Sequence, residues 1–286
     1  MLKRLFRPTN RRARLLVGIL LAGLFCVQCT RTGADPEFSL VTVIDGKAIG
    51  KNSPAVLQKV EDLAKTDHTA LLEYCLEKYQ GRYRDYTCTL VKQERIRGAL
   101  TAEQWVDVKF MASPFSVAMK WTKNPPIGDR VVYVEGKYNN QMLVRPGGLL
   151  GKLVGTVLRK PDGPEAQRNT LRPVNLFGFE RGMESLIQVY RQAERAGDLQ
   201  ETFGGYAAVD GRQTIALVRH LPPKDDYPAY ETRVYIDLEY LVPILIEGID
   251  WDNELSCRYL YRNIRFNVGL RDEDFRPEAN DMKPPK

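Results

Sequence analysis

A chain of 286 residues is long enough to form one large β-rich domain with a substantial core. It carries 42 Lys and Arg against 36 Asp and Glu, but seven of the basic residues and none of the acidic ones lie in the first 34 positions, which leaves 35 basic and 36 acidic residues beyond them. This near-neutral balance argues against a nucleic-acid-binding surface, and we expect no nucleic-acid partner.

Residues 1–34 have the order of a secretory signal peptide. Basic residues come first, an apolar run follows over 15–27, and polar and small residues continue to Ala34. The apolar run is shorter than the roughly 20 residues that a membrane-spanning helix needs. We therefore expect export to the periplasm or cell envelope. Two alternatives stay open: an uncleaved membrane anchor, and a lipoprotein that is acylated at Cys26 or Cys29.

Residues 35–52 form a mixed N-terminal segment in which 39–44 is a predicted short strand. A helix is predicted to begin at Ser53 and Pro54, since Ser caps helix N-termini and Pro fits the first helical position. Apolar residues then recur at three- and four-residue spacing over 57–79, which predicts one buried helix face.

Two features refine this helix. A local break is predicted at Thr66-Asp67, and Gly81 is predicted to end the helix because Gly readily adopts the left-handed conformation found there. His68 lies on the apolar stripe and is interpreted as a hydrogen-bonded core residue rather than a ligand, since the chain contains only two His residues.

Residues 86–146 alternate between runs rich in Val, Thr and aromatic residues and short breaks that contain Gly, Pro or Ser. This arrangement is typical of an antiparallel meander. Period-two alternation predicts that Val106, Val108 and Phe110 share one face, and that Val117, Met119 and Trp121 also share a face. Such a sheet has one apolar face, and helices are expected to cover it.

Residues 146–180 are rich in Gly and Pro, and their glycine spacing does not fit a phosphate-binding loop. The apolar stretch 149–158 has two interpretations: a mobile flap beside a cavity, or a short strand pair or helix turn that completes the core. A second amphipathic helix is predicted from Met183 to Ala193, closed by Gly197.

Strands return after this helix. The dipeptide Asp210-Gly211 between two apolar runs predicts a tight hairpin, and three more strands are predicted before residue 267. Asp252-Asn253 is interpreted as a turn rather than part of a calcium loop. We expect one domain over 53–277 and a flexible polar tail over 278–286.

Catalytic and metal-binding patterns are scarce, so neither an enzyme nor a cofactor is expected. Three Cys residues lie beyond the leader, namely Cys75, Cys88 and Cys257. In an exported protein Cys75 and Cys88 could form a disulfide, since they are the nearest pair in sequence. The other interpretation, three unpaired thiols, is favoured because sequence gives no distance between their Cα atoms.

The C-terminal third of the chain contains the motifs G-Y-A-A-V-D-G-R, Y-E-T-R-V-Y-I-D-L-E-Y-L-V-P-I and Y-R-N-I-R-F-N-V-G-L-R-D-E-D-F. In combination these motifs resemble those of the LolA-like family of periplasmic lipoprotein carriers and related proteins such as RseB. The first half, with Y-R-D-Y-T-C-T-L-V-K-Q-E-R, looks like an uncharacterised family of exported bacterial proteins in that superfamily. The resemblance implies an α+β fold: a curved antiparallel sheet forming an unclosed β-barrel, with helices across its concave face and an apolar cavity between them.

We therefore expect a non-enzymatic binding protein whose partner is a lipid or an acylated protein, and which meets membrane surfaces only transiently unless it is lipidated. The alternative is an envelope protein-interaction or sensing module of RseB type. For each residue expected to line the cavity, simple core packing is an equal alternative. These residues are Val108, Phe110, Val117, Met119, Trp121, Tyr133 and Leu143.

Export predicts that the mature protein lacks residues 1–34 or a segment of similar length. Intact-mass measurement of the protein from cell-envelope fractions should give the mass of the processed chain. An unprocessed N-terminus would contradict soluble export, and a mass increase from acyl chains on Cys26 or Cys29 would identify a lipoprotein.

Overall fold

The computed structural model describes residues 41–44, 46, 51–126, 128–148 and 155–285. The predicted signal peptide, with Cys26 and Cys29, lies outside them, as do 149–154 of the apolar stretch. Contacts gather residues 39–286 into one compact unit, which is described below. No helix among the described residues combines the length and apolarity needed to cross a membrane.

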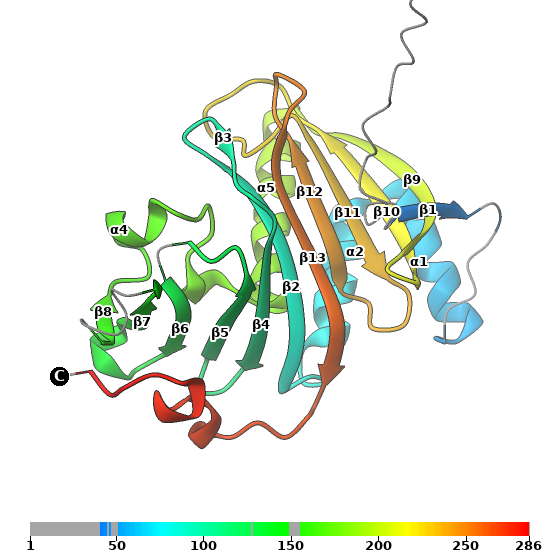
Figure 1. Ribbon diagram of the computed structural model, residues 1–286. Helices are drawn as coiled ribbons and strands as arrows, with labels where there is room; N and C mark the ends of the chain where they lie inside the picture. The colour runs from blue at the N-terminus through cyan, green and yellow to red at the C-terminus, as the bar shows by residue number, and fades with distance from the viewer. Residues whose placement is uncertain (1–40, 45, 47–50, 127, 149–154, 286) are drawn as a thin grey trace, which may run out of the picture. The chain divides into compact units, whose positions relative to one another are not determined.

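A single antiparallel sheet dominates this unit (Figure 1). Its strands in chain order are β1 (Val41–Ile44), β2 (Asp85–Ile96), β3 (Ala99–Leu100), β4 (Gln104–Met111), β5 (Ser116–Lys123), β6 (Gly128–Val134), β7 (Met142–Pro146), β8 (Val157–Arg159), β9 (Gln200–Val209), β10 (Arg212–His220), β11 (Glu231–Asp237), β12 (Pro243–Ile249) and β13 (Leu255–Phe266).

The strand order is β1-β9-β10-β11-β12-β13-β2-β4-β5-β6-β7-β8, with β3 paired only to β2. The two end strands, β1 and β8, do not pair with each other, so the sheet is curved but unclosed (Figure 1). After β1, which lies at one end of the sheet, the chain forms the middle and the opposite end through β2–β8. It then returns through β9–β13, which fill the space between β1 and β2. The expected α+β fold with an unclosed antiparallel sheet is confirmed.

Helices α1 (Pro54–Thr66), α2 (His68–Tyr79) and α5 (Phe179–Ala196) lie on one side of the sheet, while α4 (Pro164–Gln167) is a single turn (Figure 1). Asp67 causes the predicted break between α1 and α2. Its backbone N–H donates to the Leu63 carbonyl and ends α1, and its carboxylate accepts from the Ala70 N–H at 2.8 Å and caps α2.

The other local predictions about turns and helix ends are also confirmed. The Ser53 side chain accepts from the Val56 N–H at 3.4 Å at the start of α1. Gly197 ends α5 at φ +70°, in the left-handed region. Asp210 and Gly211 both have positive φ, as a two-residue hairpin of type I′ requires. The Asp250 carboxylate accepts from the backbone N–H groups of Asp252 and Glu254, which forms the predicted turn.

The main core lies between the helices and the concave face of the sheet. Tyr86 stacks on Phe110 with ring centroids 4.7 Å apart, and Phe179 at the start of α5 lies 5.0 Å from Tyr86. Gly178 has φ +106°, and a Cβ there would come within 2.8 Å of the Phe110 ring. Glycine therefore lets the chain enter α5 directly over this aromatic cluster.

His68 is a core residue, as expected. It is 1% exposed, and burial lowers its pKa to about 4. Its Nε2 lies 3.0 Å from the Ala64 carbonyl oxygen and donates to it, so Nδ1 is left to accept from the Tyr190 hydroxyl at 3.5 Å. Cys75, Cys88 and Cys257 are free thiols, and burial raises the pKa of Cys75 to about 12.

The convex face carries a second apolar cluster, and the C-terminal residues cover it. Met282 is 4% exposed and packs with Phe275 against Leu143 and its neighbours, after the short η5 helix (Glu278–Asn280). Asp281 pairs with Lys120 at 3.3 Å, which lowers the pKa of the Asp281 carboxyl. Residues 278–282 are thus packed against the sheet, contrary to the expected flexible tail. The polar composition of 278–286 suggested flexibility, but the single apolar residue Met282 anchors the segment by its burial.

Replacing this buried side chain should lower stability. Met282→Ala is expected to cost about 2 kcal/mol of unfolding free energy, through lost burial and a residual cavity. The control Met282→Leu conserves volume and should cost less than about 1.5 kcal/mol. Urea unfolding measures both variants. Wild-type stability in Met282→Ala would mean that the tail does not contribute to the fold.

Candidate functional site

A cavity of about 390 Å³ lies between the concave face of the sheet and residues 160–178, hereafter the cover segment. Strands β2 and β4–β8 form its floor, β12 and β13 contribute at one side, and the start of α5 closes one end. Its volume is within the range of small-molecule sites. The cover segment is largely irregular, with only α4 and the η3 turn (Val174–Leu176) as helical pieces.

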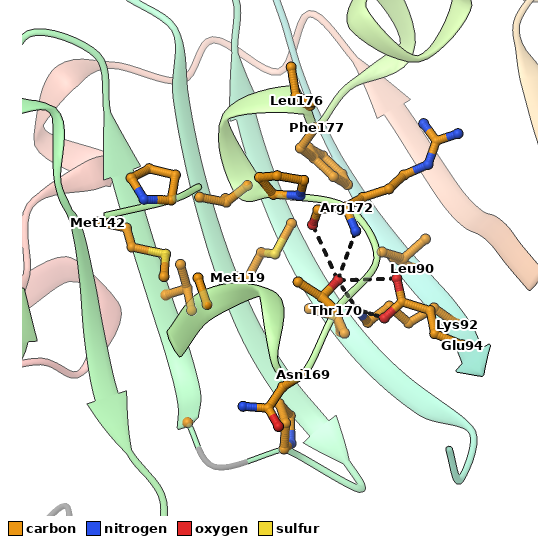
Figure 2. A pocket seen from close by; sticks show the side chains of 18 of the residues that line it. Leu90, Lys92, Glu94, Met119, Met142, Asn169, Thr170, Arg172, Leu176 and Phe177 are labelled. Carbon is orange, nitrogen blue, oxygen red and sulfur yellow. Dashed lines mark hydrogen bonds and ion pairs between the residues drawn. The ribbon is translucent and has the colours of Figure 1, made fainter. Parts of the chain in front are cut away.

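Most of the wall is apolar, and it comes from both layers. Figure 2 shows Met119 and Met142 from the sheet and Leu176 and Phe177 from the cover segment around the same space. Other apolar lining side chains are Leu90, Val106, Trp121, Val131, Val144, Val157, Ala166 and Val174. The register explains the floor: Val108, Met119, Val131, Val144 and Val157 are successive cross-strand partners and therefore share the concave face.

One side of the cavity is polar, and Glu94 of β2 is its centre. This side chain is fully buried. Its Oε2 accepts from Lys92 Nζ at 2.9 Å, and its Oε1 accepts from the Tyr259 hydroxyl at 2.7 Å. Burial raises the pKa of the Tyr259 phenol well above its usual value, so this hydroxyl remains a donor.

Glu94 also binds the cover segment. Its Oε1 accepts from the Thr170 hydroxyl at 3.1 Å (Figure 2). It also accepts from the Leu171 N–H at 3.2 Å. Lys92 Nζ lies 3.2 Å from the same Thr170 oxygen. The buried ion pair of β2 is thus hydrogen-bonded to Tyr259 of the adjacent strand β13 and to Thr170 of the cover segment. These hydrogen bonds fix the cover segment over the cavity.

The predicted lining residues fall into three groups. Met119 and Trp121 line the cavity, and the Trp121 indole N–H donates to Gln104 Oε1 at 2.9 Å. Val108, Phe110, Val117 and Tyr133 are on the same face but are buried in the main core. Leu143 lies on the convex face in the cluster with Met282.

Sequence reasoning missed Lys92, Glu94 and the whole cover segment. A signal for the two charged residues existed, because Leu90, Lys92 and Glu94 alternate along one strand and must share a face. Two opposite charges in line with an apolar face indicate a buried pair. The cover segment has no periodic pattern, so only its Gly and Pro content marked it.

Removing the Glu94 charge should destabilise the protein and loosen the cover segment. Glu94→Gln leaves the Lys92 ammonium buried without a counter-charge, and a loss of about 3 kcal/mol in unfolding free energy is expected. Cleavage within 160–178 should become faster in limited proteolysis. The control Glu254→Gln removes a half-exposed partner of Arg95 and should cost less than about 1 kcal/mol. Equal effects of the two substitutions would contradict the role of Glu94.

Metal-ligand clusters of three or more His, Cys, Asp or Glu residues do not occur in the described parts of the chain. Among curated proteins, none matches this sequence.

Several solved structures are similar to the chain. The MucA/MucB complex of Pseudomonas aeruginosa matches with 13% identity and a TM-score of 0.43 over 75% of this chain and 62% of that one, so this chain spans less than two thirds of it. A LolA superfamily protein from Nitrosomonas europaea matches with 8% identity and a TM-score of 0.30, over 73% and 97% of the two chains. The lipoprotein LppX of Mycobacterium tuberculosis matches with 11% identity and a TM-score of 0.35, over 77% and 99%.

A family model matches residues 83–283, from just before β2 to the end of the C-terminal segment. The matched region contains most of the sheet, the cover segment and the polar network of Glu94. The chain therefore belongs to the family of proteins of unknown function DUF1571.

Proposed function

We propose that this chain is an exported, non-enzymatic binding protein that holds an apolar ligand in the cavity between the sheet and the cover segment. The ligand is a lipid, or the acyl chain of a lipoprotein. The observation that carries the proposal is the cavity itself: about 390 Å³ with a largely apolar wall of side chains from two different layers. Apolar surface that no protein side chain covers gains about 25 cal/mol per Å² when a ligand buries it.

Met119 and Met142 suit an alkyl ligand. Both side chains reach the cavity, and unbranched, flexible Met side chains adapt to ligands of different shape. Lys92 and Glu94 are satisfied by each other and by their neighbours, so the polar side of the cavity presents a hydrogen-bonded pair rather than two isolated charges.

A second candidate function is an interaction module of the cell envelope. Strand β1 is an end strand of the sheet, and its Val43 side chain is 77% exposed. An extended segment of a partner protein could add to this edge through main-chain hydrogen bonds.

Ligand binding is tested with protein that has been stripped of any lipid acquired during expression. A long-chain fatty acid should bind with low micromolar affinity or better, with a negative heat-capacity change from alkyl burial. Calorimetry at several temperatures measures both quantities. Mass spectrometry of the unstripped protein should identify a co-purified lipid.

A cavity-filling variant sharpens the test. Val117 was expected to line the cavity but is fully buried in the main core, so a larger side chain there would disturb the fold. Val131 does line the cavity and is the better position to fill. Val131→Trp should weaken binding, and Val268→Trp, at an exposed site outside the cavity, should not. If the stripped, folded protein binds no acyl chain, lipid binding is excluded and the interaction module becomes the better proposal.

A further inference from the structure

The charges around the cavity are unequal. Of the described residues that line it, four are cationic (Lys92, Arg159, Arg168 and Arg172) and two are anionic (Glu94 and Glu165). Both carboxylates already have a cationic partner, since Glu94 pairs with Lys92 and Glu165 pairs with Arg159. Two cations, Arg168 and Arg172, are thus left over.

Arg168 and Arg172 form no ion pair within the described part of the chain. Arg168 is exposed and follows α4 directly, while Arg172 is partly buried. The Arg172 guanidinium lies over the Tyr259 ring, whose centroid is 5.5 Å from its central carbon. A guanidinium over an aromatic face keeps its N–H edges free for another partner.

The backbone that carries Arg172 is held in place. The Arg172 N–H donates to the Thr170 oxygen at 3.3 Å, and that hydroxyl also lies 3.2 Å from the Arg172 carbonyl oxygen. The same Thr170 oxygen lies 3.1 Å from buried Glu94. The backbone of Arg172 is therefore fixed before any ligand arrives, which lowers the entropy cost of binding.

The cationic side chain of Arg172 and the apolar side chains of Met119 and Met142 line different parts of the cavity. In Figure 2 the Arg172 side chain extends away from Met119 and Met142, on the same side as Leu176 and Phe177 of the cover segment. A ligand with its alkyl chain against the two Met residues would direct its other end toward Arg172.

We propose that the ligand is a single-chain anionic amphiphile whose carboxylate or phosphate head group is bound by Arg172, with Arg168 adding positive potential at the mouth. This inference rests on the proposed function and specifies its ligand class. A guanidinium binds either oxyanion through two parallel N–H···O bonds, and low-dielectric walls strengthen the attraction.

The test compares three ligands with the same twelve-carbon chain: dodecanoic acid, dodecyl phosphate and uncharged dodecan-1-ol. Wild-type protein should bind at least one of the two anions about tenfold more tightly than the alcohol, since a hydrogen-bonded charge contributes roughly that factor. Comparing the affinities for dodecanoic acid and dodecyl phosphate shows whether the head group is a carboxylate or a phosphate. The preference should shrink as salt concentration rises.

Substitutions of Arg172 test whether this residue causes the preference for anionic ligands over the alcohol. Arg172→Gln should lose about tenfold in affinity for the preferred anion and leave the affinity for the alcohol unchanged. Arg172→Lys keeps the charge but loses the bidentate geometry, so its affinity for the preferred anion should lie between those of wild type and Arg172→Gln. Arg195→Gln removes an exposed charge near the end of α5, outside the cavity, and serves as the matched control. Thermal unfolding verifies that each variant is folded.

The outcomes separate the two proposals. Equal affinity of wild-type protein for the anions and the alcohol overturns the anionic ligand, and an Arg172→Gln variant with unchanged anion affinity overturns the role of Arg172. Both results leave apolar binding intact. If wild-type protein binds none of the three ligands, the proposed function fails and the ligand class fails with it.

Discussion

The apolar concave face of an unclosed antiparallel sheet has to be covered, and this protein covers it in two ways. Helices α1, α2 and α5 pack against one part of that face and form a dense core that contains Tyr86, Phe110 and Phe179. The irregular cover segment lies over strands β4–β8, and the cavity remains beneath it. Close packing on one part of the face keeps the sheet rigid, so that the floor of the cavity has a defined shape.

Glu94 joins these two parts. Its strand, β2, lies between β13 and β4 in the sheet, where the part covered by helices meets the part under the cover segment. A carboxylate removed from water is costly unless every oxygen is hydrogen-bonded and a cation is near. Lys92 and Tyr259, both on the sheet, donate to one oxygen each. Thr170 and Leu171 add two further donors to Oε1 only when the cover segment is in place. The position of the cover segment over the cavity is thus coupled to the burial of one charge.

Much of the fold could be predicted from sequence, because its signals are local. Asp210-Gly211 predicts a hairpin through positive φ, and Asp67 breaks a helix through its capping carboxylate. The faces of β4 and β5 followed from period-two alternation, and their cross-strand register agrees with it. Leu143 was assigned to the wrong face because Met142, Leu143 and Val144 are all apolar, so period-two alternation does not show which of them face the concave side. Leu143 pairs with Val132 on the convex face.

The candidate site was harder to predict than the fold, since it depends on contacts between distant segments. Thr170 and Glu94 are 76 residues apart, and nothing near either residue in sequence indicates their hydrogen bond. Periodicity identifies which side chains face the concave side, but it does not distinguish Val117, which is in the core, from Met119, which lines the cavity. What differs is the layer above them: Val117 is fully buried in the main core, whereas the irregular cover segment leaves space over Met119.

The two faces of the sheet also differ in what covers them, and this difference bears on where a ligand binds. On the convex face, Phe275 and Met282 from the C-terminal segment fill the apolar cluster around Leu143, so the chain's own side chains bury that surface. On the concave face, the cover segment supplies Leu176 and Phe177 as walls yet leaves a volume between itself and Met119. Packed apolar surface gains nothing more from a ligand, whereas incompletely packed apolar surface does. The same sheet therefore has a packed apolar contact on one side and an incompletely packed apolar cavity on the other.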